Sequence, residues 1–377
     1  MLSSYPLASE QEKGKLILKI LGYLWPPGSP SNLFAVFRDF DTVLSLIKGK
    51  GNFIHSFEVY LLGFHIIKLL LEVNGKNVLH PQFKPDKRIY DSWLITSTSH
   101  DFGYPLEVIP ELSNKFSEMF KLLYLNGVAK KAKELSAIRE LHLQKSLLSV
   151  EVYNVSRRKK ETINVEHFVL EGIKNSIDGN INDAREIRDV LKESLIKIGK
   201  QEHSYIKHSY VSALILARAY IHYLSTSKKW KKKGELWRTQ LLQKVAAAIA
   251  LHALPSSRED LINKISFDLN PIAYLLFLVD NIQDWNRSSR LSEKHPTYIL
   301  TDYASSEKEI RIGYTLGHGH WKKEMVMDAK KYIADKQRKF KALRPPHRSL
   351  NISIYLHFST DHGEDLGTIV WPPISPH

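Results

Sequence analysis

Apolar side chains recur every three or four positions through most of the first 290 residues, which is the spacing of one face of an α-helix. Glycine, proline and charged clusters divide this pattern into separate segments. The expected helices cover residues 11–24, 31–48, 54–73, 88–99, 107–124, 129–150, 164–175, 182–199, 203–225, 236–252 and 271–285. No fixed period recurs, so the pattern predicts one extended helical domain and not a repeat array.

The last eighty or so residues have a different pattern. Apolar and polar residues alternate there in four segments, which is typical of half-buried strands. These segments cover residues 298–304, 309–316, 350–358 and 366–371, and a charged amphipathic helix is expected over 321–341. The predicted fold class is therefore mainly α, with a helical domain over 1–294 and a small α+β (ββαββ) subdomain over 295–377.

The composition is that of a globular protein with a basic surface. Apolar residues make up 43% and charged residues 25% of the 377 residues, and the net charge is +14. This surplus favours anionic partners, such as a phosphorylated small molecule or nucleic acid. The absence of cysteine excludes disulfides, cysteine-ligated metal sites and a thiol nucleophile.

The absence of cysteine favours a cytoplasmic location, and two further features predict a soluble protein without a membrane partner. The first residues lack the basic segment followed by an apolar segment that marks a signal peptide. The apolar stretch from Tyr60 to Val73 is interrupted by His65 and Lys68, and it falls short of the ~20 residues that a spanning helix needs.

The sharpest local signal for chemistry is the adjacent pair His100-Asp101. It lies at the predicted end of a helix that Gly103 and Pro105 cannot continue. An imidazole beside a carboxylate can bind one divalent cation, and the second carboxylate oxygen can reach another. The alternative is an ordinary helix end with a histidine favoured by the helix dipole.

Four further polar residues lie in apolar helical segments. His55, His208 and His252 are each surrounded by apolar residues, and Asp280 ends a run of ten residues with no other charge. A buried carboxylate costs several kcal/mol unless a cation pairs with it. Each histidine alone fits a hydrogen-bonded core residue, but the set indicates a metal centre. Histidine is also the main route to a transition-metal site in a chain without cysteine.

In chain order these residues resemble the H…HD…H…H…D pattern of the HD-domain metal-dependent phosphohydrolases. The six positions are His55, His100, Asp101, His208, His252 and Asp280. The surrounding segments HSFEVYLLG, SHDFGYPLE, HSYVSALIL and LLFLVDNIQDWNR are also similar to helices of that superfamily. The resemblance covers about residues 50–290 and implies an all-helical HD-type core. The long gap between Asp101 and His208 then requires a helical insertion, over about residues 106–200.

The resemblance also implies roles for the six residues. His55, His100, Asp101 and Asp280 would hold one divalent cation, and Asp101 would bridge to a second held by His208 and His252. His100 and Asp101 would thus be catalytic. The ions would be Mn, Fe, Mg, Ni or Zn. The implied activity is hydrolysis of a phosphate ester of a nucleotide-like substrate by a metal-activated hydroxide.

Three nearby residues are candidates for supporting roles. Arg287 can clamp a phosphate, although surface pairing is its alternative. Tyr104 can contact substrate or simply pack. Asp284 lies one turn beyond Asp280 and is a candidate partner for a ligand histidine.

The basic clusters leave a second class of function open. They cover residues 157–160, 228–233 and the helix 322–341. Trp230 lies inside the middle cluster, where it can stack on a base while the lysines contact phosphates; a solvated loop is the alternative. The protein would then be a nuclease or phosphodiesterase on nucleic acid, or a nucleic-acid-binding regulatory module with a vestigial HD site. The second is weakened because no position of the pattern is lost.

Overall fold

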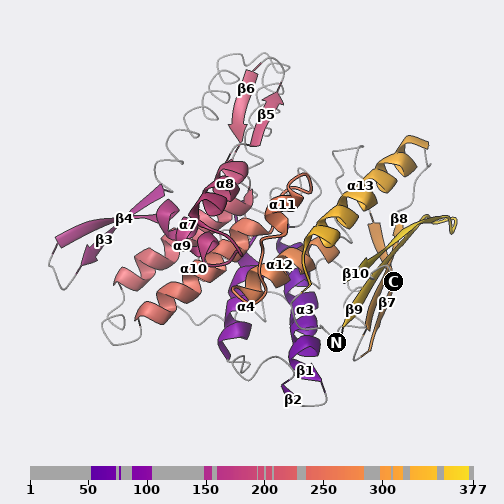
Figure 1. The fold of residues 1–377 in the computed structure, drawn as a ribbon, viewed down its shortest axis with the longest axis horizontal. Helices are drawn as coiled ribbons and strands as arrows, with labels where there is room; N and C mark the ends of the chain where they lie inside the picture. Colours follow the sequence, from indigo (N-terminus) through magenta and orange to yellow (C-terminus); the bar gives the residue numbers. More distant parts are fainter. Residues whose placement is uncertain are drawn as a thin grey trace, which may run out of the picture. The chain divides into compact units, whose positions relative to one another are not determined.

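A computed structural model gives the fold of the 377-residue chain (Figure 1). It describes residues 52–73, 76–77, 87–103, 148–154, 159–192, 194–198, 201–205, 208–226, 235–283, 298–306, 309–316, 323–345 and 352–372. The chain divides into two units. Unit 1 comprises Met1–Thr98 and Leu254–His377, and unit 2 comprises Ser99–Ala253.

The helices of unit 1 are largely buried and pack closely. Before its C-terminal α+β part, they are α3 (Asn52–Leu71), α4 (Lys87–Ser99, whose last residue belongs to unit 2), the short α11 (Glu259–Ile262) and α12 (Pro271–Ile282). A short hairpin of β1 (Glu72–Val73) and β2 (Lys76–Asn77) follows α3. A Cβ atom at Gly63 would lie 1.9 Å from the ring of Trp93, so glycine is what lets α4 approach α3.

Helix α12 packs on α3 within unit 1. Asn270 caps its N-terminus by accepting a 3.2 Å hydrogen bond from the amide of Ala273, and Pro271 takes the first helical position. Every residue of α12 except Asp280 is buried, which explains why its sequence is apolar on all sides.

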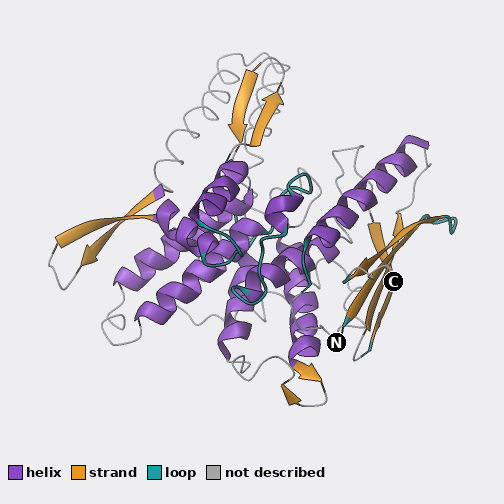
Figure 2. Ribbon diagram, viewed as in Figure 1, coloured by secondary structure: helices purple, strands orange, loops and turns teal. Residues whose placement is uncertain are grey.

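The C-terminal part of unit 1 is the predicted ββαββ arrangement, and this prediction is confirmed. Its elements are β7 (Tyr298–Ser305), β8 (Glu309–Leu316), α13 (Lys323–Ala342), β9 (Ser353–Ser359) and β10 (Asp365–Trp371). The four strands form one sheet, drawn orange in Figure 2. Its order is β10-β9-β8-β7, with β8 and β9 parallel and the other neighbouring pairs antiparallel. The parallel pair follows from α13, which connects these two strands as a crossover.

This α+β part is joined to the end of α12 by side chains. Tyr314 donates a hydrogen bond to the carbonyl of Ile282, and Lys336 donates to the carbonyl of Asn281. These carbonyls belong to the last turn of α12, where no intrahelical donor remains for them. The expected boundary near residue 295 lies outside the described residues, so the two-domain division stays a prediction.

Unit 2 is a helical layer with two β-hairpins. Its helices are α7 (Val165–Lys174), α8 (Ile181–Lys192), α9 (His208–Thr226) and α10 (Glu235–Leu251). The hairpins are β3 (Ser149–Asn154) with β4 (Lys159–Asn164), and β5 (Ser194–Ile198) with β6 (Gln201–Tyr205). Helix α10 packs against α7 and α9, and its run Ala246–Ala248 is fully buried between neighbours.

The described helices confirm a mainly α chain, but several sequence-based boundaries are wrong. The helix expected over 182–199 ends at Lys192, and the one expected over 203–225 begins at His208, because the residues between them pair as β5 and β6. The helix expected over 129–150 does not reach its predicted end, because β3 begins at Ser149. The expected helices at 11–24, 31–48 and 107–124 lie outside the described residues. Among the described helices, none is long and apolar enough to cross a membrane.

Candidate metal centre

Three imidazole nitrogens converge on one buried carboxylate oxygen in unit 2. Oδ1 of Asp101 lies 3.4 Å from Nε2 of His208, 3.6 Å from Nε2 of His100 and 4.0 Å from Nε2 of His252. The side chains of Asp101, His100 and His252 are no more than 5% exposed, whereas that of His208 is 23% exposed. His208 is therefore the most exposed member of the cluster.

The spacing of these atoms is that of ligands around a common cation. The three distances exceed the ~2.7–3.2 Å of an ordinary N–H···O hydrogen bond. Two ligand atoms that are each about 2.1 Å from a tetrahedral cation lie about 3.4 Å from one another. Among the described residues, His100, Asp101 and His252 each offer one ligand atom within 4.8 Å of the other two. A divalent cation therefore fits this cluster.

A tight turn after α4 carries Asp101 to α9. The amide of Phe102 donates a 3.2 Å hydrogen bond to the carbonyl of Ser99, and the amide of Gly103 donates a 2.6 Å bond to Oγ of Ser212. A Cβ atom at Gly103 would lie 2.3 Å from the carbonyl oxygen of His208. Only glycine lets the turn come this close to the first turn of α9, where His208 is the first residue.

His252 is held in the orientation that a metal ligand requires. It follows α10, and its Nδ1 lies 2.6 Å from the carbonyl of Ile249. A carbonyl only accepts, so Nδ1 carries the hydrogen and Nε2, the atom that faces Asp101, keeps its lone pair. The ring of His252 lies 4.9 Å from that of His100 and 5.4 Å from that of His208, measured between centroids.

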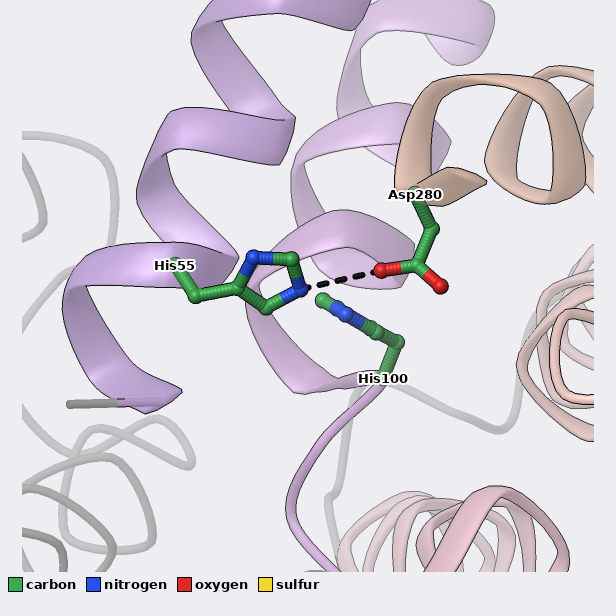
Figure 3. Close-up of side chains that lie close together, drawn as sticks. All are labelled: His55, His100 and Asp280. Carbon is green, nitrogen blue, oxygen red and sulfur yellow. Dashed lines mark hydrogen bonds and ion pairs between the residues drawn. The ribbon is translucent and has the colours of Figure 1, made fainter. Parts of the chain in front are cut away.

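A second pair of predicted ligands lies in unit 1. Nε2 of His55, on α3, is 2.9 Å from Oδ1 of Asp280, on α12. Figure 3 shows this bond. His55 is 3% and Asp280 is 14% exposed, so the one charged residue of α12 is paired as its apolar surroundings require.

The other nitrogen of His55 continues into a buried hydrogen-bond chain. Nδ1 contacts Oε1 of Gln283, and Nε2 of Gln283 donates a 2.7 Å bond to Oε2 of Glu58. Sequence reasoning missed both Glu58 and Gln283. The available signal was spacing, since each lies three residues beyond a predicted ligand and therefore on the same helical face.

The structure thus brings His100, Asp101, His208 and His252 together in unit 2, and His55 to Asp280 in unit 1. The roles of these six residues as metal ligands stay predictions. Tyr104, Asp284 and Arg287 lie outside the described residues, as does the basic cluster 228–233. Imidazole nitrogen with carboxylate oxygen suits Mn, Fe, Ni or Zn better than Mg, which prefers oxygen ligands and retains several waters.

Comparison with protein-family models, with curated proteins and with solved structures found no match.

Proposed function

We propose that this protein is a metal-dependent phosphohydrolase that cleaves a phosphate ester of a nucleotide-like substrate. The observation that carries the proposal is the convergence of three imidazole nitrogens on one buried oxygen of Asp101. Together with His55 and Asp280, these four residues occupy the order H…HD…H…H…D in the sequence, which supports this reaction class above other uses of a histidine cluster.

In this proposal, His100, Asp101 and His252 hold a divalent cation, with His208 at the solvent side of the cluster. The sequence pattern assigns His55 and Asp280 to the ligand set as well. A cation bound by these residues polarises a phosphoryl oxygen and lowers the pKa of water, which supplies the nucleophile for phosphate-ester hydrolysis.

The residues of the chain would contribute orientation and charge. The hydrogen bond from Nδ1 of His252 to the carbonyl of Ile249 fixes the imidazole before any ligand arrives. His208 is the most exposed member of the cluster, so a substrate phosphate would approach from its side. The net charge of +14 would raise the local concentration of a phosphorylated anion.

The test compares the 377-residue chain with two aspartate variants. Metal content is measured after incubation with Mn²⁺ and desalting, and turnover is measured on an aryl phosphodiester and on nucleoside phosphates. Asp101→Asn keeps the side-chain volume but removes the charge, so we expect it to lose bound Mn²⁺ and about a hundredfold or more of the turnover. Asp328→Asn, at an exposed position of α13, is the matched control and should match the wild type. Full turnover in Asp101→Asn would overturn the proposal.

The same preparation separates the two alternatives that involve nucleic acid. A nuclease would cleave single-stranded RNA or DNA in preference to the small substrates, in a reaction that requires Asp101. A regulatory binding module would bind the strand with a steep dependence on salt and would cleave nothing. Turnover of the small substrates combined with weak, salt-insensitive strand binding would support the phosphohydrolase.

A further inference from the structure

Two further buried side chains, Gln283 and Glu58, extend the His55–Asp280 pair of unit 1 into a hydrogen-bonded chain. Glu58, on α3, accepts a 2.7 Å hydrogen bond from the side-chain amide of Gln283, whose oxygen contacts Nδ1 of His55. Glu58 and His55 are each 3% exposed and Gln283 is fully buried. Water therefore does not compete for these bonds.

The chemistry of the groups fixes the direction of every bond in this chain. An ionised carboxylate only accepts, so the NH₂ group of Gln283 must face Glu58. The amide oxygen of Gln283 then faces His55, and because it also only accepts, Nδ1 of His55 carries a hydrogen. In the neutral ring, Nε2, which lies 2.9 Å from Oδ1 of Asp280, then holds the lone pair that a bound cation requires.

The two helices supply these residues at matching positions. Glu58 lies three residues after His55 on α3, and Gln283 lies three residues after Asp280 at the C-terminal end of α12. The backbone amide of Gln283 donates a 2.8 Å bond to the carbonyl of Val279, which anchors the residue to α12. The side chain of Gln283 is thus tied to both helices, and it sets the position of His55 relative to Asp280.

We propose that Gln283, supported by Glu58, is a positioning residue that holds His55 with Nε2 beside Oδ1 of Asp280 for a divalent cation. This inference rests on the proposed function and adds two residues to it. Outer partners of ligand histidines typically change metal affinity by about 10- to 100-fold when they are removed.

The first test measures Mn²⁺ binding to the full chain through the electron paramagnetic resonance signal of free Mn²⁺. Gln283→Met keeps the side-chain length and removes both hydrogen bonds, so we expect affinity to fall about 10- to 100-fold. In a His55→Ala background, Gln283→Met should cause no further loss, because the residue acts through that imidazole. Gln240→Met, at an exposed position of α10, is the matched control and should bind as the wild type does.

A charge exchange separates positioning from simple packing. Gln283→Glu alone places two carboxylates together and should weaken Mn²⁺ binding strongly. Adding Glu58→Gln restores both bonds, because the carboxylate at position 283 accepts from His55 and from the amide at position 58. We expect the double variant to recover Mn²⁺ affinity to within a few-fold of the wild type. If Gln283→Met does not fold, this exchange decides alone.

The outcomes distinguish this inference from the function on which it rests. Wild-type affinity in Gln283→Met would overturn the positioning role and leave the phosphohydrolase in place. The positioning role would also be overturned if Gln283→Met lowered Mn²⁺ affinity equally in the wild type and in the His55→Ala background. It would likewise be overturned if the double variant bound Mn²⁺ no more tightly than Gln283→Glu alone. Absence of Mn²⁺ binding in the wild type would overturn both proposals.

Discussion

Nε2 of His208 lies 3.4 Å from Oδ1 of Asp101, although the two residues are far apart in the sequence. The contact depends on the turn after α4, which Gly103 and Ser212 fasten to the first turn of α9. The carboxylate and the imidazole therefore occupy one cluster because two backbone segments can approach each other there.

Replacing Gly103 should damage the fold and the cluster together. A Cβ atom at position 103 would lie 2.3 Å from the carbonyl oxygen of His208, so Gly103→Ala forces the turn away from α9. We expect a loss of about 1–3 kcal/mol in the free energy of unfolding and weaker Mn²⁺ binding. Urea unfolding and metal titration measure these changes. Gly179→Ala is the control, since its nearest contact is the flexible side chain of Asp183; equal effects in both variants would contradict the explanation.

A bound cation should stabilise the protein through Asp101. Mn²⁺ at a hundred times its dissociation constant adds about 2.7 kcal/mol to the free energy of unfolding, because it binds the folded state alone. Thermal unfolding with Mn²⁺ and with a chelator measures the effect. The midpoint of the wild type should rise with Mn²⁺, and that of Asp101→Asn should stay close to its chelated value. An equal rise in both proteins would place the bound ion elsewhere.

The buried ammonium of Lys336 should contribute to stability. It donates to the carbonyl of Asn281 and lies 5.1 Å from the ring centre of Tyr332. Lys336→Met keeps most of the side-chain volume but leaves that carbonyl without its charged donor, so we expect a loss of about 1.5–3 kcal/mol. Urea unfolding checks this. Lys330→Met, on the exposed face of α13, should change stability by less than about 0.5 kcal/mol; similar losses in both would argue against the contact.

His65 should make the protein less stable in mild acid. Burial lowers the pKa of His65, and the nearby charge of Lys68 lowers it further. Among the described residues, its buried Nε2 atom has no hydrogen-bond partner, and its ring lies 6.3 Å from that of Tyr303. As the pH falls below about 6.5, the unfolded chain binds a proton at this residue before the folded chain does. The folded state is therefore not destabilised by His65 while the pH stays above the pKa that this residue has in the unfolded chain. As the pH falls from there toward the lowered pKa of His65 in the folded chain, the free energy of unfolding decreases.

A variant that cannot titrate isolates this contribution. Urea midpoints of the wild type and His65→Phe are compared at pH 7.5 and at pH 5.5. The wild type should lose more stability than His65→Phe over this interval, since phenylalanine keeps the aromatic contact and has no proton to bind. Equal losses would assign the acid sensitivity to other groups.

Local patterning predicted much of the described fold. The helices that contain His55, His208 and Asp280 were each expected, and so was the ββαββ order of the C-terminal residues. The hairpins β3–β4 and β5–β6 were not expected. In the second of these, Ser194–Ile198 continues an apolar spacing that fits a helix, and its pairing with Gln201–Tyr205 ends α8 instead.

The sequence by itself determined the helical periodicity, the strand alternation and the chemical identity of the candidate ligands, because these depend on the residues and their near neighbours. Only the tertiary structure decided which side chains meet. The convergence of His208 and His252 on Asp101, and the bonds of Gln283 to His55 and Glu58, depend on how closely helices and turns pack. Such distances arise from long-range packing, which no local pattern encodes.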